Sequence, residues 1–138
     1  MEEASLTFKI IGCAFAVHNA LGYGFLEKVH ENALRIELEN AGFHVQPQAP
    51  ISVTYAGKVV GEYYADLLVE GRVIVEIKAD SKLIPQHEVQ LVNYLTATDS
   101  EFGLLINFGT SVEHKRKHRK VLPKSDSETF VALDLNGQ

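Results

Sequence analysis

The segment from residue 65 to residue 78 constrains the fold of this 138-residue chain more than any other. Its odd positions are apolar on both sides of Gly71, and the side chains of a strand alternate between two faces. A turn with an odd number of residues pairs odd positions with odd positions, whereas a two-residue loop at Glu70 and Gly71 would set Asp66 opposite Val75. Glycine also accepts the positive φ that three-residue hairpin connections need. The sequence therefore predicts a two-stranded hairpin that reverses at Gly71.

The two faces of this hairpin differ in chemistry. In the predicted register, Asp66, Glu76 and Lys78 share one face as direct or diagonal neighbours, together with Leu68 and Ile74. Exposed ion pairs are common and weak, but charged groups within an apolar strand usually have a partner or a metal. We therefore predict a half-buried pocket floor with a divalent-cation site. The opposite, core-facing side is expected to carry Ala65, Leu67, Val69, Val73, Val75 and Ile77.

Composition fits one ordinary domain, with 46% hydrophobic residues and 22% charged residues. The single cysteine, Cys13, argues against a disulfide framework and against a zinc cluster. The chain starts with acidic residues, and we expect no run to approach the ~20 apolar residues of a membrane span. We expect a cytoplasmic protein with no membrane partner.

Positive charge is concentrated near the C-terminus, although the net charge of the chain is −5. The acidic balance speaks against nonspecific coating of nucleic acid by the whole surface. Residues 114–120 carry five fixed positive charges in seven positions. Such a run is more often a solvated tail, and the alternative is an arm that contacts phosphates. The residues concerned are Lys115, Arg116, Lys117, Arg119 and Lys120.

Apolar spacing predicts two helices before the hairpin and one after it. Leu6, Ile10, Ala14, Val17 and Leu21 recur every three or four residues, as in an amphipathic helix. A helix between the hairpin and the next buried strand would let those two strands run parallel. The order of helices and strands along the chain predicts an α/β fold, with a small mixed sheet flanked by helices. The expected elements are helices over 5–21 and 25–41, strands over 51–55, 59–69, 73–77 and 102–108, a helix opening at Pro85 or Gln86, and a polar tail in which 129–135 could add a short strand.

The helix after the hairpin carries a stripe formed by His87, Gln90, Leu91 and Tyr94. Taken alone, the Gln90 amide and the Tyr94 hydroxyl suit the capping of buried backbone groups as well as contact with a substrate. The acidic pair next door favours the second role, because neutral donors could orient a phosphate without competing with a cation. We expect His87, Gln90 and Tyr94 to position a substrate.

With these residues in place, the chain resembles the PD-(D/E)XK nuclease superfamily and, within it, a bacterial family called GxxExxY proteins. The resemblance runs from Gly22 to about Gly109. Three motifs carry it: the naming motif opened by Gly24-Phe25-Leu26-Glu27, the catalytic hairpin with Asp66 and Glu76-Ile77-Lys78, and the Q-x-x-x-Y element of the RecB-like branch at Gln90 and Tyr94.

The resemblance implies a restriction-endonuclease-like αβββαβ core in a single domain over residues 1–138, with a basic C-terminal segment from about residue 110. It also implies that Glu27 is a metal ligand, because nucleases of this branch commonly supply another glutamate from the helix before the sheet. From the sequence alone, an acid at a helix start is already explained by the helix dipole. His30 departs from the family by standing where tyrosine is expected.

These observations predict a metal-dependent nuclease that hydrolyses phosphodiester bonds in DNA, with RNA left open as a substrate, in DNA repair, processing or defence. Asp66, Glu76 and the Ile77 carbonyl would hold Mg²⁺ or Mn²⁺ through oxygen ligands, with Glu27 on the same ion or a second one. Lys78 would orient or deprotonate the attacking water, or stabilise the negative charge that grows on the phosphate.

Two other classes of function stay open at this point. The acidic net charge and the departure at His30 are compatible with a catalytically silent module that binds nucleic acid or regulates a partner. A protein-interaction subunit is the third class, for instance a homodimer that packs through the first helix.

Overall fold

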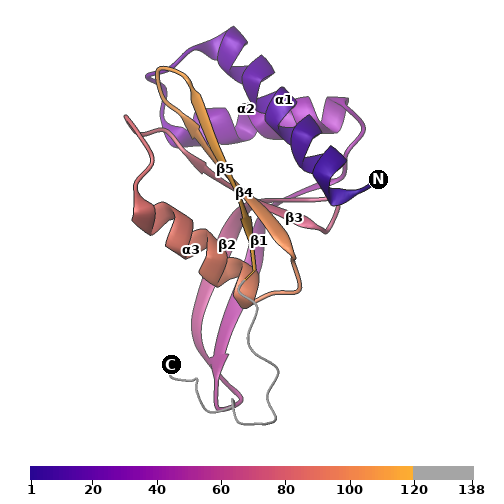
Figure 1. Ribbon diagram of the computed structural model, residues 1–138, viewed down its shortest axis with the longest axis vertical. Helices are drawn as coiled ribbons and strands as arrows, with labels where there is room; N and C mark the ends of the chain where they lie inside the picture. The colour runs from indigo at the N-terminus through magenta and orange to yellow at the C-terminus, as the bar shows by residue number, and fades with distance from the viewer. Residues whose placement is uncertain (120–138) are drawn as a thin grey trace.

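A five-stranded mixed sheet in the order β1-β2-β3-β4-β5 forms the centre of the structure, a computed structural model that describes residues 1–119 (Figure 1). β3 and β4 run parallel, as predicted from the intervening helix, and the other neighbours are antiparallel. The possible strand over 129–135 lies outside the described residues. The elements are α1 (Glu3–Leu21), α2 (Glu27–Asn40), β1 (Val45–Tyr55), β2 (Lys58–Val69), β3 (Val73–Lys78), α3 (Pro85–Thr96), β4 (Phe102–Phe108) and β5 (Val112–His118).

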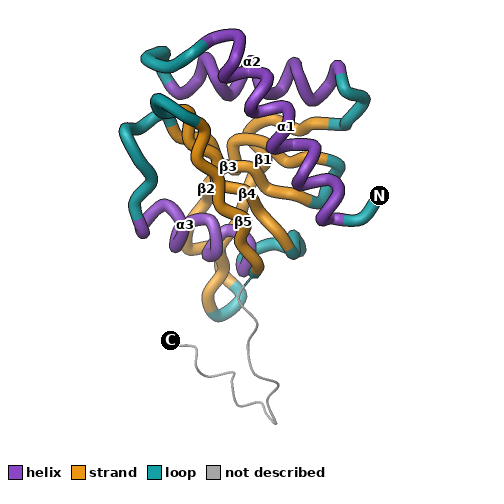
Figure 2. The backbone as a smooth tube through the Cα atoms, turned by 45° about the horizontal axis from the view of Figure 1, so that its top comes forward, coloured by secondary structure: helices purple, strands orange, loops and turns teal. Residues whose placement is uncertain are grey.

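The helices cover the sheet from both sides (Figure 2). α1 and α2 pack on one face, where Leu6, Ile10 and Leu34 join the inward residues of the strands in the larger apolar cluster. α3 packs on the other face through Leu91 and Leu95, in a second cluster. The prediction of an α/β fold with a small mixed sheet between helices is confirmed.

The hairpin between β2 and β3 has the predicted register. Leu67 pairs with Val75 and Val69 with Val73, so three residues form the turn. Two of them have positive φ, 56° at Glu70 and 64° at Gly71. The prediction that every odd apolar residue faces one core was wrong for Ala65, which packs in the α3-side cluster. The strand therefore switches faces between Ala65 and Leu67.

β2 leaves β3 after only three residue pairs, at Leu67 and Val75. Further along, β2 continues to pair with β1 as far as Lys58 and Tyr55. The far halves of these two strands form a hairpin arm that projects from the rest of the sheet (Figure 1). We call residues 49–65 the β1–β2 arm. Its position decides what can lie beside α3.

The basic segment near the C-terminus is a strand, so the prediction of a polar tail was wrong. β5 pairs antiparallel with β4 at the edge of the sheet. Lys117 Nζ lies 3.0 Å from Glu88 Oε1 of α3, and the Arg116 guanidinium lies 4.2 Å from the centre of the Phe102 ring. Charged side chains on an edge strand discourage pairing with another chain, which gives this run a structural purpose. Phosphate contacts by Lys115, Arg116, Lys117 and Arg119 stay a prediction, and Lys120 lies outside the described residues.

α1 is more apolar on its outer side than the sequence analysis anticipated. Among the described residues, α1 is the one helix that is long enough and apolar enough to cross a membrane, judged by length and composition alone. The expectation that no segment approaches such a span was therefore wrong. Its inner residues Leu6 and Ile10 are fully buried in the core. Phe8 and Phe15 are exposed on the outer side. The proposed dimer contact through this helix stays a prediction.

Gly103 provides a test of the packing between α3 and the sheet. A Cβ at this position would lie 2.8 Å from Leu91 Cδ1 and 3.2 Å from the Ile74 carbonyl oxygen. We predict that Gly103→Ala lowers the free energy of unfolding by about 1–3 kcal/mol, because the close approach leaves no room for a methyl group. Chemical denaturation measures this change.

The matched control is Gly12→Ala on α1, where a Cβ would meet nothing within 4 Å. Alanine in an exposed helix should leave stability unchanged or raise it by up to about 1 kcal/mol. Equal stability of the two variants would contradict the packing described for α3.

Candidate active site

Asp66 and Glu76 hydrogen-bond the opposing backbone at the point where β2 and β3 separate. Asp66 Oδ2 accepts a hydrogen bond from the Ile77 N–H at 2.8 Å, and Glu76 Oε2 accepts one from the Asp66 N–H at 3.0 Å. These carboxylates satisfy backbone groups that a continued ladder would otherwise pair. Within residues 1–119, Asp66 Oδ1 and Glu76 Oε1 accept no hydrogen bond. Each carboxylate thus keeps one oxygen for another partner.

Burial raises the pKa of both carboxyl groups. Glu76 is only 6% exposed. Desolvation and the nearby charge of Asp66 raise the pKa of Glu76 to about 8, although the hydrogen bond from the Asp66 N–H opposes this change. Desolvation likewise raises the pKa of Asp66 to about 6, against the hydrogen bond from the Ile77 N–H. Two neighbouring acids that resist ionisation, Glu76 buried and Asp66 partly buried, favour the binding of a cation.

The predicted metal ligand Glu27 lies at the start of α2, within electrostatic reach of this pair. Partial burial raises the pKa of Glu27, and the charge of Lys78 opposes that change. The charge of Glu27 in turn raises the pKa of Asp66 and of Glu76. In the described part of the chain, no group of three or more Asp, Glu, His or Cys side chains is arranged to hold a metal ion. The structure thus brings Asp66 and Glu76 together, and Glu27 does not join them in a group of this kind.

Glu31 is a second acid of α2 near the pair, and the sequence analysis did not single it out. It is 4% exposed, and its Oε2 accepts hydrogen bonds from Lys28 Nζ at 3.0 Å and from Gln48 Nε2 at 2.8 Å. Gln48 stands on β1 at the position facing Asp66, with a φ of 52° that non-glycine residues rarely adopt. The charge of Glu31 contributes to the raised pKa of Asp66. Gln48 therefore connects α2 to the base of the β1–β2 arm.

Lys78 ends β3, and the loop that follows it is held by a buried amide. Asn107 of β4, opposite Lys78 in the parallel register, is fully buried. Its Oδ1 accepts a hydrogen bond from the Asp80 N–H at 2.8 Å, and its Nδ2 donates to the Asp80 carbonyl at 3.0 Å and to Glu113 Oε1 at 2.9 Å. This clamp fixes the direction in which the chain leaves Lys78.

The predicted positioning residues of α3 occupy different surroundings. His87 accepts the Ile84 N–H on Nδ1 at 3.3 Å, and its Nε2 lies 3.7 Å from Asp80 Oδ2, so both ring nitrogens have protein neighbours. Gln90 is exposed, whereas Tyr94 is only 8% exposed. Desolvation raises the pKa of the Tyr94 hydroxyl, with further contributions from Glu76 and Asp66. Tyr94 therefore lies within electrostatic reach of the acids.

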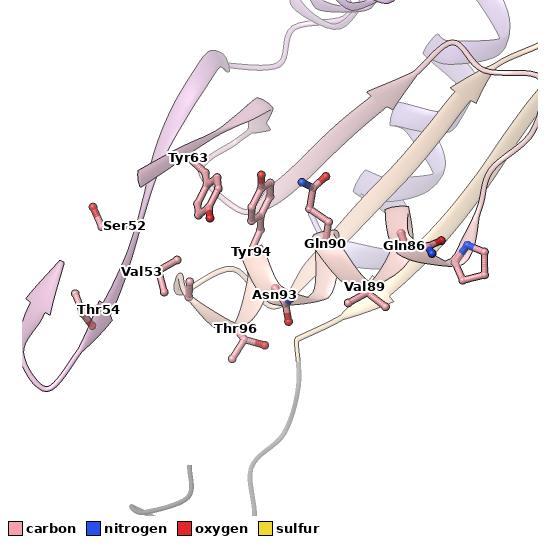
Figure 3. A pocket seen from close by; sticks show the side chains of 12 residues that line it. Ser52, Val53, Thr54, Tyr63, Gln86, Val89, Gln90, Asn93, Tyr94 and Thr96 are labelled. Carbon is pink, nitrogen blue, oxygen red and sulfur yellow. The ribbon is translucent and has the colours of Figure 1, made fainter. Parts of the chain in front are cut away.

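A groove of about 980 Å³ lies between α3 and the β1–β2 arm, with Gln90 and Tyr94 in its lining (Figure 3). The acids Asp66 and Glu76 do not line it. Tyr63 of the arm does, and its ring centre lies 5.6 Å from that of Tyr94. The sequence analysis missed this groove because it depends on the separation of β2 from β3.

His30, the departure from the family pattern, is a packing residue. Its ring is fully buried and stacks on Phe108 of β4, with ring centres 4.5 Å apart. Nε2 lies 3.0 Å from the Gly22 carbonyl oxygen, and within residues 1–119 Nδ1 has no hydrogen-bond partner. His30 thus anchors α2, the helix that carries Glu27 and Glu31, and the departure from tyrosine does not by itself argue for a silent module.

The carboxylate oxygens of Asp66 and Glu76 are ligands that suit a divalent cation. Mg²⁺ and Mn²⁺ favour oxygen ligands, and Mg²⁺ is commonly bound through one or two carboxylates while it retains several waters. Asp66 Oδ1 and Glu76 Oε1, which accept no hydrogen bond within residues 1–119, are of this kind. Lys78 follows Glu76 on the same strand, and its positive charge opposes the rise in the pKa of each acid.

A mixed sheet between helices, with two acids and a lysine on adjoining strands, defines an α/β protein with a paired-carboxylate site. The chain belongs to the PD-(D/E)XK nuclease superfamily, whose family model matches residues 4–121. None of the curated proteins compared matches the sequence significantly.

Two solved structures share the fold. SSO0001 is 20% identical, with a TM-score of 0.55 over 68% of this chain and 50% of its own. An alkaline exonuclease, LHK-Exo from Laribacter hongkongensis, is 16% identical, with a TM-score of 0.51 over 67% of this chain and 56% of its own. The present chain thus spans about half the length of these structures.

The raised pKa of Glu76 predicts how stability depends on pH. An acid whose pKa is higher in the folded state favours folding only while it is protonated, so Glu76 should lower stability as pH rises from about 4.5 to about 8. We predict that Glu76→Gln, in the presence of a chelator, is more stable than the wild type at pH 9 by on the order of 2 kcal/mol. Urea unfolding should show this gain shrinking toward pH 5.

Glu88→Gln is the control, because the hydrogen bond from Lys117 lowers the pKa of Glu88. That acid favours folding when it is ionised, so its replacement should give no gain at pH 9. A wild type as stable as Glu76→Gln at pH 9 would show that Glu76 is not held in the surroundings described.

Proposed function

We propose that this chain is a metal-dependent nuclease that hydrolyses phosphodiester bonds, with DNA ahead of RNA as its substrate. The observation that carries the proposal is the carboxylate pair of Asp66 and Glu76, each with one oxygen on the opposing backbone and one that accepts no hydrogen bond from the described residues 1–119. Membership of the PD-(D/E)XK nuclease superfamily supports the same reaction class.

Asp66, Glu76 and the Ile77 carbonyl would hold Mg²⁺ or Mn²⁺, with Glu27 as a further ligand. When bound, the ion would polarise the phosphate and lower the pKa of a bound water. Lys78 would supply a positive charge for the phosphate oxygens as negative charge grows on them. The attacking water forms the new oxygen–phosphorus bond, and the departing oxygen leaves with a proton.

The more specific assignments belong to this proposal as well. The motifs at Glu27, Gln90 and Tyr94 support placement among GxxExxY proteins of the RecB-like branch. A role in DNA repair, processing or defence and a location in the cytoplasm accord with a nucleic-acid substrate. The cations of β5 would attract the phosphate backbone, and a homodimer or partner protein would cover the exposed side of α1.

The role of Lys78 can be tested by cleavage. We predict that Lys78→Ala lowers the rate of Mg²⁺- or Mn²⁺-dependent cleavage of DNA by on the order of 10²-fold or more, because the developing phosphate charge loses its ammonium partner. Initial rates on single-stranded DNA, duplex DNA and RNA measure this effect.

Lys9→Ala on the exposed side of α1 is the matched control, and its rate should equal that of the wild type. Equal cleavage by Lys78→Ala and the wild type would remove Lys78 from the reaction.

A further inference from the structure

The groove between α3 and the β1–β2 arm has the size of a ligand site. Its volume of about 980 Å³ is at the upper end of the ~300–1,000 Å³ typical of ligand pockets. One wall comes from the arm, at Ser52, Thr54 and Tyr63, and the other from α3 (Figure 3). Both walls present side chains that are chemically suited to a nucleobase.

No charged residue lines this groove within the described part of the chain. Its polar groups are neutral, and α3 contributes the amides of Gln86, Gln90 and Asn93 and the hydroxyls of Tyr94 and Thr96. Within residues 1–119 these three amides have no hydrogen-bond partner. Amides both donate and accept hydrogen bonds, as the edges of bases do. The groove is thus matched to bases and poorly matched to a row of phosphates, which would call for lysine or arginine.

Tyr63 offers an open aromatic face in this groove. It is 47% exposed, whereas the neighbouring Tyr94 is 8% exposed and backs it at a ring-centre distance of 5.6 Å and an interplanar angle of 37°. Gly61 makes room for the ring, since a Cβ there would lie 3.2 Å from Tyr63 Cε2. An aromatic face of this kind stacks on any base.

Tyr94 also connects the groove to the acids. It lines the groove, and the charges of Glu76 and Asp66 act on its hydroxyl. A base held on Tyr63 would therefore lie next to Tyr94, whose hydroxyl is within electrostatic reach of the acids.

We propose that this groove binds unpaired nucleotides of a single-stranded substrate, with one base stacked on Tyr63 and others hydrogen-bonded by the amides of α3. The inference rests on the proposed nuclease function and names its substrate class. A duplex keeps its bases stacked inside the helix and presents phosphates outward, so it cannot use the open face of Tyr63. Unpaired bases of DNA or RNA can.

Binding without cleavage tests this directly. The full chain in a chelator is titrated against a fluorescein-labelled single strand of about 12 nucleotides, within the site sizes seen for single-strand binders, and anisotropy is recorded. The same measurement is made with the matching duplex, with RNA of the same sequence and with an abasic strand of equal length. We expect the single strand to bind about tenfold or more tightly than the duplex and the abasic strand. The DNA and RNA arms show which sugar is accepted.

Tyr63→Ala should weaken single-strand binding about tenfold, and Tyr63→Phe should retain it. Tyr64→Ala is the matched control, because Tyr64 is the next residue of the same strand, is 57% exposed and does not line the groove. Gly61→Ala keeps both tyrosines, but its Cβ requires the Tyr63 ring to shift by a few tenths of an ångström, so it should weaken binding by less than Tyr63→Ala.

The proposal is overturned by equal affinity of Tyr63→Ala and Tyr64→Ala, by an abasic strand that binds as tightly as the normal strand, or by the absence of binding. Its failure is distinguishable from that of the nuclease proposal. If Tyr63→Ala leaves metal-dependent cleavage intact, only the proposal of base binding in the groove is refuted. If binding depends on the bases but no metal-dependent cleavage occurs, only the proposal of nuclease activity is refuted.

Discussion

The separation of β2 from β3 at Asp66 and Glu76 is the constraint on which the rest of this structure depends. Backbone pairing holds the hairpin up to Leu67 and Val75, and beyond that point two carboxylate oxygens take over the opposing N–H groups. The acids are thereby fixed in the gap between the strands, where desolvation raises the pKa of each. The interaction that ends the ladder also places the two carboxylates side by side.

The same separation sets the position of the β1–β2 arm. Once β2 is released from β3, the arm projects from the sheet and leaves a groove between itself and α3. Gln48 fixes the base of the arm through its hydrogen bond to Glu31 of α2. Tyr63 and Tyr94 then meet across the gap, one from each wall. Helix α2, the acids and the groove are therefore parts of one arrangement.

Regular periodicity made much of this fold predictable from the sequence, including the bounds of β4 and the hairpin register set by the turn at Gly71. β1 begins at Val45, earlier than predicted, because Pro47 and Pro50 break the pattern but are tolerated in an edge strand. β5 was mistaken for a tail because a charged edge strand has the composition of solvated chain. The acids and Lys78 were predicted from alternation within one hairpin. Glu31, the reversal of Ala65 and the groove arise from contacts between distant elements, which local patterns do not encode.

A crystal structure of the chain soaked in Mn²⁺ would test the central claim most directly, because anomalous scattering locates the ion independently of the protein atoms. The account predicts one strong peak at a coordination distance of about 2 Å from both Asp66 Oδ1 and Glu76 Oε1. Carboxylates that remain free of the ion at saturating Mn²⁺, or an ion bound only elsewhere, would contradict it.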